Sequence, residues 1–326
     1  MKLIVEGDRH IKSQHPFNLA HYAYNDWVVQ QPWNNPETIW FSEGDWYNTS
    51  YPDPEENAIA LDFLHRTNFN RYIIQAGNHE YSRPKDRYSL SPLEKLGVEI
   101  LYQETVLNLG SLKILSLPFY YPYLRQDVGR MEEYYSRLHE LPIGQDEYDF
   151  IFGHLYFMND FGSYCDMTNL KGKKFFGHDH GIRSNEVGEY LGSPMPTSYT
   201  QRGQRGHLLL IDLEDGSYEY IDVPMFLDYA TVKYPDPLPL VGADYVIWDV
   251  EGVVDKETTI EHYQRLEPNI TFREFHTKDA TGNDSEDVSP ASEQWSLSAF
   301  LASFYEKNST PIAVQTIIND KVNNTA

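Results

Sequence analysis

The chain has 326 residues, a formal net charge of −23 and a single cysteine, Cys165. This composition excludes an internal disulfide and a zinc site built from several cysteines, and the acidic balance argues against a nucleic-acid binder with a broad basic surface. Hydrophobic residues make up 40% of the chain, enough for a sizeable core, and no apolar run approaches the roughly 20 residues that a membrane helix needs. We therefore expect a soluble cytoplasmic protein with no membrane partner.

Nine segments before residue 225 are expected to be strands, and the five strongest each end in a polar cluster. These five are KLIVEGDRH (2–10), TIWFSEGDW (38–46), RYIIQAGNHE (71–80), YDFIFGHL (148–155) and KKFFGHDH (173–180). The other four are VEILY (98–102), LKILSLPF (112–119), HLLLIDL (207–213) and YEYIDVP (218–224). Because no helices separate the later strands, they indicate a second sheet packed on the first.

Helical patterns fill several gaps between these strands. Asp53 and Pro54 form a start signal for a helix over ENAIALDFLHR (56–66). The apolar face predicted for this helix consists of Ile59, Leu61, Phe63 and Leu64. A short helix closed by glycine is expected at 91–97 and a longer helix at 130–141. Strands that alternate with helices predict a layered α/β fold.

The five polar clusters supply Asp, Asn and His side chains at predicted strand ends, where ligands of α/β proteins gather. The candidate ligands are Asp8, His10, Asp45, Asn78, His79, His154, His178 and His180. Oxygen and imidazole ligands without a thiolate suit Mn²⁺, Mg²⁺, Fe or Zn²⁺, and this set is too large for one ion. Two ions about 3.5–4 Å apart can hold a shared hydroxide and stabilise an in-line phosphoryl displacement.

His178 and His180 stand one residue apart at the end of the last of these strands. Side chains at positions i and i+2 of an extended chain point to the same side, so both imidazoles can reach one point. Taken alone, such a pair more often marks an exposed loop. The four other clusters make a shared metal site the better interpretation.

The motifs GDRH, GD, GNHE, GH and GHDH, in this order within residues 7–180, resemble the signature of the calcineurin-like metallophosphoesterases. The resemblance implies a four-layer α/β/β/α sandwich with two divalent metal ions, most simply Mn²⁺. It implies that Asp8, His10 and His180 hold one ion, that Asn78, His154 and His178 hold the other, and that Asp45 bridges them. His79 matches the family's catalytic histidine, which stabilises the transition state or protonates the leaving oxygen.

Within that superfamily, the layout is most similar to SbcD-type nucleases of DNA double-strand-break repair and the related recombination nuclease subunits of T4-like phages. Three features carry this similarity: YLGSP (190–194) followed by a strand pair, a small α/β module, and a terminal helix pair. The similarity implies an exonuclease or endonuclease that hydrolyses DNA phosphodiester bonds. It also implies an SbcC-type coiled-coil ATPase as partner and the host cytoplasm as location if a phage encodes the chain, and it leaves a homodimer open.

Four regions follow from this reading of the chain. They are a nuclease domain at 1–225, a cap module for DNA contact at 226–276, a flexible linker at 277–290, and a helix pair for ATPase docking at 291–326. YPDPLPL (234–240) is expected to be a proline-rich linker ahead of a strand, a helix and a strand. The only cations of the cap module are Lys233, Lys256, Arg265 and Arg273.

Two alternatives to the nuclease remain open. The same two-metal site would serve a phosphatase or phosphodiesterase acting on nucleotides or phosphoproteins, which the negative charge favours. A non-catalytic scaffold of the same fold would be expected to lose ligands, and every expected ligand is present. Asn48, three residues after Asp45, occupies a position where some nuclease members carry a histidine.

Overall fold

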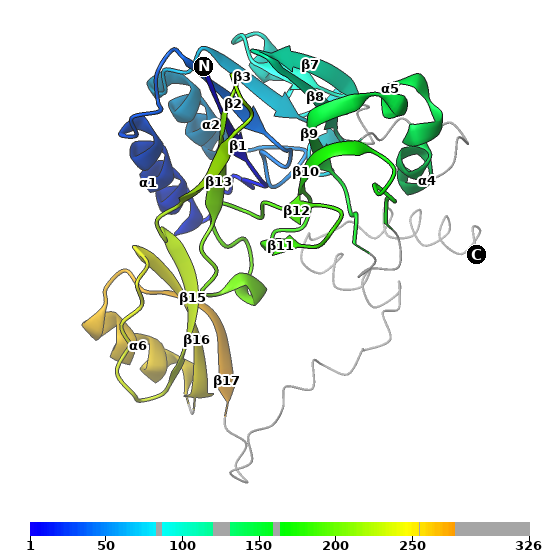
Figure 1. Ribbon diagram of the computed structural model, residues 1–326. Coiled ribbons are helices and arrows are strands. Elements are labelled where there is room, and N and C mark those ends of the chain that lie inside the picture. The colour runs from blue at the N-terminus through cyan, green and yellow to red at the C-terminus, as the bar shows by residue number, and fades with distance from the viewer. Residues whose placement is uncertain (83–86, 120–130, 159–163, 254, 278–326) are drawn as a thin grey trace, which may run out of the picture.

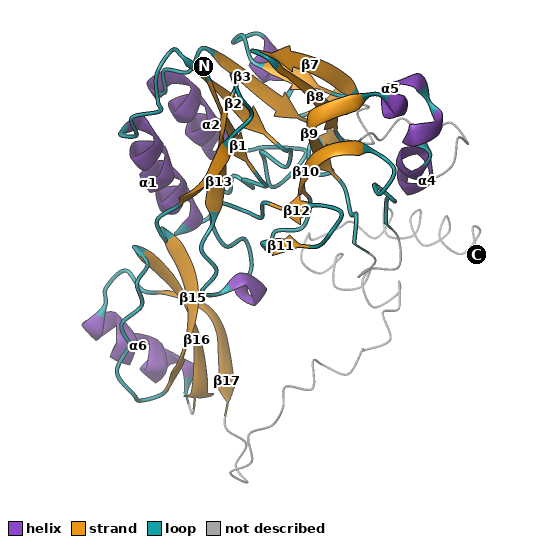
Figure 2. Cartoon of the chain, viewed as in Figure 1, coloured by secondary structure: helices purple, strands orange, loops and turns teal. Residues whose placement is uncertain are grey.

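The computed structural model describes residues 1–82, 87–119, 131–158, 164–253 and 255–277. Two six-stranded sheets pack face to face, and helices cover their outer faces (Figure 1). A three-stranded sheet with one helix forms a smaller unit beside them (Figure 2). The predicted four-layer α/β/β/α sandwich is confirmed. No helix among these residues is both long and apolar enough to cross a bilayer.

The first sheet has the strand order β14-β13-β1-β2-β3-β6. Its strands are β1 (Lys2–Glu6), β2 (Thr38–Ser42), β3 (Arg71–Gln75), β6 (Glu99–Leu101), β13 (His207–Asp212) and β14 (Tyr218–Asp222). β1, β2, β3 and β6 are parallel, whereas β13 is antiparallel to β1 and β14 is antiparallel to β13. Parallel strands bring their carboxyl ends to one edge, so the segments that follow β1, β2 and β3 lie side by side.

The second sheet has the order β11-β12-β10-β9-β8-β7. Its strands are β7 (Thr105–Leu109), β8 (Leu112–Leu117), β9 (Glu147–His154), β10 (Lys171–Gly177), β11 (Arg183–Ser184) and β12 (Glu189–Tyr190). The four inner strands are parallel, and the edge strands β7 and β11 are antiparallel to their neighbours. β7, β11 and β12 are not among the predicted strands.

The expectation that the late strands form the second sheet is wrong for β13 and β14. β13 pairs with β1 from Lys2↔Asp212 to Val5↔Leu209 and thereby extends the first sheet. Its residues Leu208 and Leu210 join the core under the helices, whereas Leu209 and Ile211 join the core between the sheets. Because both faces of β13 are apolar, it can occupy an inner position of a sheet that is covered on both sides.

Two helices, α1 (Phe17–Val29) and α2 (Pro54–Arg66), cover the outer face of the first sheet. Asp53 caps α2 as predicted: its side chain accepts the main-chain N–H of Glu56, and the Glu56 side chain accepts that of Asp53. The predicted apolar face is wrong at Leu61, which is 45% exposed. Two residues turn a helix by about 200°, so Leu61 points away from the buried Phe63.

Helix α1 is not among the predicted helices, and the long helix predicted at 130–141 is broken. In α1, the polar residues His21 and Asn25 lie on the buried face and obscure its apolar period. The broken region consists of α4 (Met131–Ser136), the 3-10 helix η3 (Leu138–Glu140) and α5 (Pro142–Gln145). Leu141 is extended because it precedes a proline. The short helix at 91–97 is confirmed as α3 (Ser91–Glu94), followed by Gly97 at φ +86°.

A short hairpin and the cap module complete the described chain. The hairpin pairs β4 (Tyr81–Ser82) with β5 (Arg87–Tyr88). The cap module contains the parallel strands β15 (Leu227–Lys233), β16 (Tyr245–Val253) and β17 (Thr271–Thr277), with helix α6 (Lys256–Leu266) between the last two. β15 was not predicted. The proline-rich segment 234–240 therefore connects two strands of this sheet, β15 and β16, rather than preceding the sheet. The linker from residue 278 onward and the helix pair at 291–326 lie outside the described residues.

Candidate metal centre

Polar side chains from all five predicted strand ends meet at one place. Strands β1, β2 and β3 of the first sheet and β9 and β10 of the second lead into it. The residues form two groups whose ligand atoms lie within 4.8 Å of one another. The first group is Asp8, His10, Asp45 and His180, and the second is Asp45, His154 and His178. Asp45 belongs to both, which is the arrangement expected for a bridging ligand.

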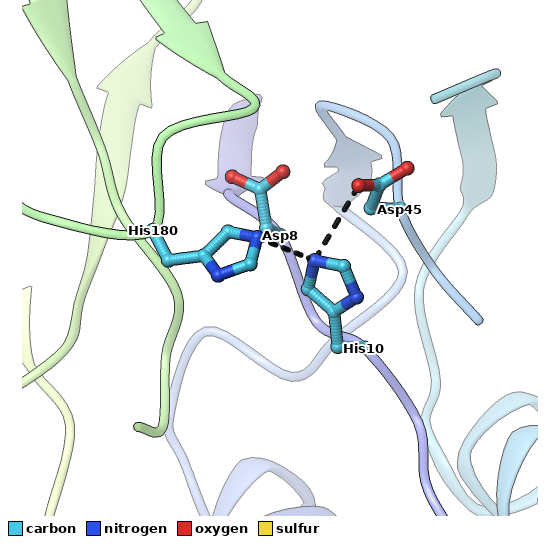
Figure 3. Close-up of side chains that lie close together, drawn as sticks. All are labelled: Asp8, His10, Asp45 and His180. Atoms are coloured by element: carbon cyan, nitrogen blue, oxygen red, sulfur yellow. Dashed lines mark hydrogen bonds and ion pairs between the residues drawn. The ribbon is translucent and has the colours of Figure 1, made fainter. Parts of the chain in front are cut away.

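His10 contacts two other members of the first group, His180 and Asp45 (Figure 3). Its Nε2 is 2.8 Å from His180 Nε2 and 3.4 Å from Asp45 Oδ2. Asp8 accepts the main-chain N–H of His178 at 2.8 Å, which ties the segment after β1 to the segment after β10. Atoms that can ligate a cation therefore converge from three segments that are far apart in the sequence.

The second group contains a contact that needs a proton or a cation. His154 Nδ1 is 2.9 Å from the main-chain carbonyl of Glu43, which can only accept, so Nδ1 carries a proton. The lone pair of a neutral His154 is then on Nε2, yet Nε2 faces Asn78 Oδ1 at 2.9 Å and Asp45 Oδ2 at 3.4 Å. A divalent ion among these three atoms would satisfy all of them. The residues therefore fit the implied metal.

Asp45 Oδ2 is the atom that the two groups share. It is buried, has no hydrogen-bond partner among the described residues, and lies 3.4 Å from Nε2 of both His10 and His154. The other carboxylate oxygen accepts the main-chain N–H of His79 at 2.9 Å. A buried carboxylate oxygen without a partner costs free energy unless a cation neutralises it. This atom fits the bridging role that the sequence motif implies.

Burial and neighbouring charges shift the pKa values of the centre in different directions. Burial opposes ionisation of Asp45, but His154 and His10 hold its pKa well below the usual range, whereas burial raises the pKa of Asp8. Burial lowers the pKa of His178 to about 3. Burial also disfavours the charged form of His154, but Asp45 outweighs it and raises the pKa of His154 to about 9. Without an ion, His154 therefore keeps a proton where a metal would bind.

Three residues of the centre adopt a left-handed backbone conformation that is uncommon outside glycine. The φ angle is +48° at His10, +47° at Asp45 and +84° at His178. Such conformations cost of order 1–3 kcal/mol each and cluster at functional sites. A glycine is also needed beside them, since a Cβ at Gly77 would lie 2.1 Å from Asp45 Oδ1. The surrounding sheets therefore hold the candidate ligands in a strained arrangement.

His79 lies at the accessible side of the centre, with 35% of its side chain exposed. Its Nδ1 is 2.6 Å from the main-chain carbonyl of Asn48, so Nδ1 donates. Nε2 lies 3.8 Å from Asp45 Oδ2. A histidine that is oriented through one nitrogen while the other faces a site is the geometry of a general acid or base. The sequence drew attention to the Asn48 side chain, but its main-chain carbonyl makes this contact.

Glu80 is a site residue that the sequence analysis missed. Its carboxylate accepts the main-chain N–H groups of Gly77 at 2.7 Å, Tyr47 at 3.0 Å and Asp45 at 3.1 Å. Glu80 thus joins the segment after β2 to the segment after β3, and so fixes the position of Asp45 relative to Asn78. The available signal was the acid that closes GNHE, directly after His79.

A cavity of about 390 Å³ adjoins the centre. Four candidate ligands line it, Asp45, Asn78, His178 and His180, together with His79. The other lining residues are Tyr156, Asp179, Gly181, Ser198, Thr200, Gln201 and Gln204. The Tyr156 ring lies 3.9 Å from the His178 ring, centroid to centroid, and so covers one side of the second group. Four of the lining residues come from one segment at 197–204, where the sequence analysis predicted no site residue.

The sequence matches no protein-family model and no curated protein. Among solved structures, a protein of unknown function from Aquifex aeolicus aligns at 14% identity over 53% of this chain and 88% of its own, with a TM-score of 0.33. A conserved uncharacterized protein from Streptococcus pneumoniae, described as a predicted phosphoesterase, aligns at 12% identity over 68% of this chain and 97% of its own, with a TM-score of 0.28. Overlaps this loose carry no argument. The two ligand groups, placed where strands of both sheets end, support a metal site in general.

Proposed function

We propose that the chain is a two-metal phosphodiesterase that acts on DNA as a nuclease. The observation that carries metal dependence is Asp45 Oδ2, which is buried, has no partner in the described part of the chain, and faces Nε2 of His10 and His154. When bound, two divalent ions lower the pKa of an attacking water and neutralise charge on the phosphate. Asp8, His10, Asp45 and His180 would hold one ion, and Asp45, Asn78, His154 and His178 the other.

In this proposal His79 delivers the proton that the leaving oxygen requires. The Asn48 carbonyl keeps one proton on Nδ1, so His79 acts as an imidazolium that carries a second proton on Nε2, the ring nitrogen nearer to Asp45. That second proton passes to the leaving oxygen, and a neutral imidazole remains. His79 also lines the cavity beside the centre, which is where a phosphate ester can approach it. General acid catalysis of this kind contributes about 10²–10⁴-fold to a rate.

The cavity lining favours a diester over a monoester. Among the described residues, the lining contains no lysine or arginine, and its carboxylates are those of Asp45 and Asp179. A phosphate monoester gains a second negative charge with a pKa near 6, and beyond the two ions this lining has little to balance that charge. A diester carries one charge. DNA as the diester, and an SbcC-type ATPase bound through residues 291–326 as partner, are finer proposals. They are supported by the sequence similarity of YLGSP (190–194) with its strand pair, of the cap module and of the predicted terminal helix pair.

The test compares four substrates in the presence of Mn²⁺. They are end-labelled duplex DNA, end-labelled single-stranded DNA, bis-p-nitrophenyl phosphate and p-nitrophenyl phosphate. We expect the full-length chain to hydrolyse DNA and the small diester faster than the monoester. His79→Ala should lower these rates by about 10²–10⁴-fold. His65→Ala, which removes an exposed histidine of α2, is the matched control and should retain full activity.

Each outcome of this assay has a definite meaning. Hydrolysis that survives in His79→Ala would refute the role of His79. A preference for the monoester would favour the alternative, a phosphatase acting on nucleotides or phosphoproteins. Hydrolysis of the small diester with DNA left intact, even after the proposed ATPase is added, would refute the nuclease. No metal-dependent hydrolysis of any of the four substrates would refute the proposal as a whole.

A further inference from the structure

The segment 197–204, here called the bridging loop, contacts both the metal centre and the cap module. It contains the 3-10 helix η4 (Tyr199–Gln201). At one end, Thr197 Oγ1 lies 2.7 Å from His180 Nδ1. At the other end, Tyr199 Oη lies 2.9 Å from Thr231 Oγ1, and the Gly203 N–H donates to Asp228 at 2.7 Å. The loop is therefore held from both sides while its first residue contacts a candidate ligand.

The hydrogen bonds of Thr197 indicate which partner donates in its contact with His180. That direction sets the tautomer of His180 that can bind a metal through Nε2. Gln201 Oε1 accepts the main-chain N–H groups of Thr197 at 2.7 Å and Ser198 at 3.2 Å, which identifies this atom as the amide oxygen. The Thr197 hydroxyl lies 3.0 Å from the same oxygen and donates to it. The hydroxyl oxygen is then free to accept from His180, so the proton of His180 is on Nδ1.

This arrangement leaves the lone pair of His180 on Nε2, the atom that faces the first ligand group. Nε2 lies 2.8 Å from His10 Nε2, in the group that also contains Asp8 and Asp45. Histidines that ligate metals usually donate their second N–H to a carbonyl, carboxylate or water, which sets tautomer and ring orientation. His154 donates to the main-chain carbonyl of Glu43, whereas His180 has a side-chain hydroxyl as partner.

We propose that Thr197 and Gln201 are positioning residues, which hold His180 in the tautomer and orientation that one divalent ion requires. This inference depends on the proposed function in assuming that His180 ligates an ion. Gln201 is 8% exposed, and it also accepts two main-chain N–H groups, so it keeps the start of the bridging loop in place. Thr197 transmits that position to His180 through a single hydroxyl.

The test uses the full-length chain and Mn²⁺ alone as the probe. Thr197→Val removes the hydroxyl and keeps the shape, Thr197→Ser restores the hydroxyl, and Thr197→Ala serves if the valine variant does not fold. Thr168→Val is the matched control, because its hydroxyl donates to Asp166 in an exposed loop away from the centre. Electron paramagnetic resonance of free Mn²⁺ measures affinity at each site, and ¹⁵N nuclear magnetic resonance of the metal-free chain reports the His180 tautomer.

We expect Thr197→Val to weaken one of the two Mn²⁺ sites by about 10–100-fold, the usual effect of losing a partner of a ligand. The other site, the Thr197→Ser variant and the Thr168→Val control should behave like wild type. The signal of a proton on His180 Nδ1 should weaken in Thr197→Val. For bis-p-nitrophenyl phosphate, kcat should fall while KM changes little, since Thr200 and Gln204 still line the cavity.

Wild-type affinity at both sites in Thr197→Val, with an unchanged His180 tautomer, would overturn the inference. A fall in affinity that Thr197→Ser does not reverse would also overturn it. If the wild-type chain takes up two Mn²⁺ ions but hydrolyses no phosphodiester, the proposed function fails, and the Thr197 series still decides the positioning role. A wild-type chain that binds no Mn²⁺ would overturn both.

Discussion

The metal centre and the cap module differ in what neutralises a buried carboxylate. In the centre, Asp45 Oδ2 has no hydrogen-bond partner within the described residues and is surrounded by imidazole nitrogens. In the cap module, the buried carboxylate of Asp249 accepts two hydrogen bonds from Arg273, at 2.8 and 2.6 Å. The first arrangement is satisfied by a cation from solution, and the second is satisfied by the chain itself.

This difference bears on how the cap module could contact DNA. Of its four cations, Arg273 is paired with Asp249 and Glu274, and Arg265 lies 3.4 Å from Glu261. The Arg273 guanidinium also lies over the ring of Tyr199, 4.3 Å from its centroid, and so contacts the bridging loop. The described part of the cap module therefore uses these arginines for internal contacts and for holding the loop. Its contact with DNA stays a prediction.

The largest effect is expected from removing one carboxylate charge in each region. Asp45→Asn should lower hydrolysis by about 10²–10⁴-fold and abolish Mn²⁺ uptake at both sites, because metal ions supply several kcal/mol of charge stabilisation. Asp249→Asn should instead lower the free energy of unfolding by about 1.5–3 kcal/mol, the usual value of a charged hydrogen bond. Its hydrolysis of the small diester should stay at the wild-type rate.

Mn²⁺ titration, diester hydrolysis and guanidinium denaturation of the two variants measure this contrast. The shared role of Asp45 would be disproved if Asp45→Asn still bound two ions. A loss of diester hydrolysis in a folded Asp249→Asn variant would show that the two regions are not separable in the way proposed.

A smaller effect is expected at Glu80. In Glu80→Gln, an amide NH₂ replaces one carboxylate oxygen. It would face a main-chain N–H group that has an acceptor only in the wild-type chain. Leaving one buried donor unsatisfied costs about 1–3 kcal/mol, and the displaced Asp45 should also reduce kcat. Glu56→Gln is the matched control, because glutamine can replace glutamate in the capping box of α2. Thermal unfolding and kcat for the diester measure both, and equal effects of the two substitutions would contradict a special role for Glu80.

The smallest effect, at most about tenfold in Mn²⁺ affinity for each pH unit, is the pH dependence of the stabilisation that Mn²⁺ gives the folded chain. The pKa of Glu80 is raised by burial to about 8, and that of His154 to about 9 by Asp45 against the opposing effect of burial. The folded metal-free chain therefore binds protons that the unfolded chain has released. The stability from Glu80 is complete below its ordinary pKa of about 4.5 and lost through pH 8, and that from His154 is complete below about 6.5 and lost through pH 9.

Mn²⁺ must displace the proton on His154, so its affinity should rise by up to about tenfold per pH unit until pH 9. The difference in Tm between chains in Mn²⁺ and in EDTA should accordingly grow between pH 6.5 and 9. Thermal melts across this range measure it, with His65→Ala as a control for surface histidines. A difference in Tm that does not change with pH would show that His154 is not deprotonated on metal binding.

Several features could be predicted from the sequence because they depend on neighbouring residues. The five main strands, the cap of α2 and the glycine after α3 follow from alternation, capping signals and backbone conformation, each within a few residues. The ordered motifs also singled out the residues that meet at the centre, although their role as ligands stays a prediction.

Only the tertiary structure decided which distant segments touch. Whether β13 joins the first or the second sheet depends on pairing with β1, some 200 residues earlier, and its apolar residues suit either. The contacts of His180 with Thr197, of Glu80 with Asp45, and of Arg273 with Asp249 depend on loop paths and side-chain rotamers. The sequence by itself determined the five main strands and the types of side chain at their ends, since these depend on local chemistry. Folding decided which residues orient or neutralise these side chains. No local pattern encodes a contact between segments that only the packed sheets bring together.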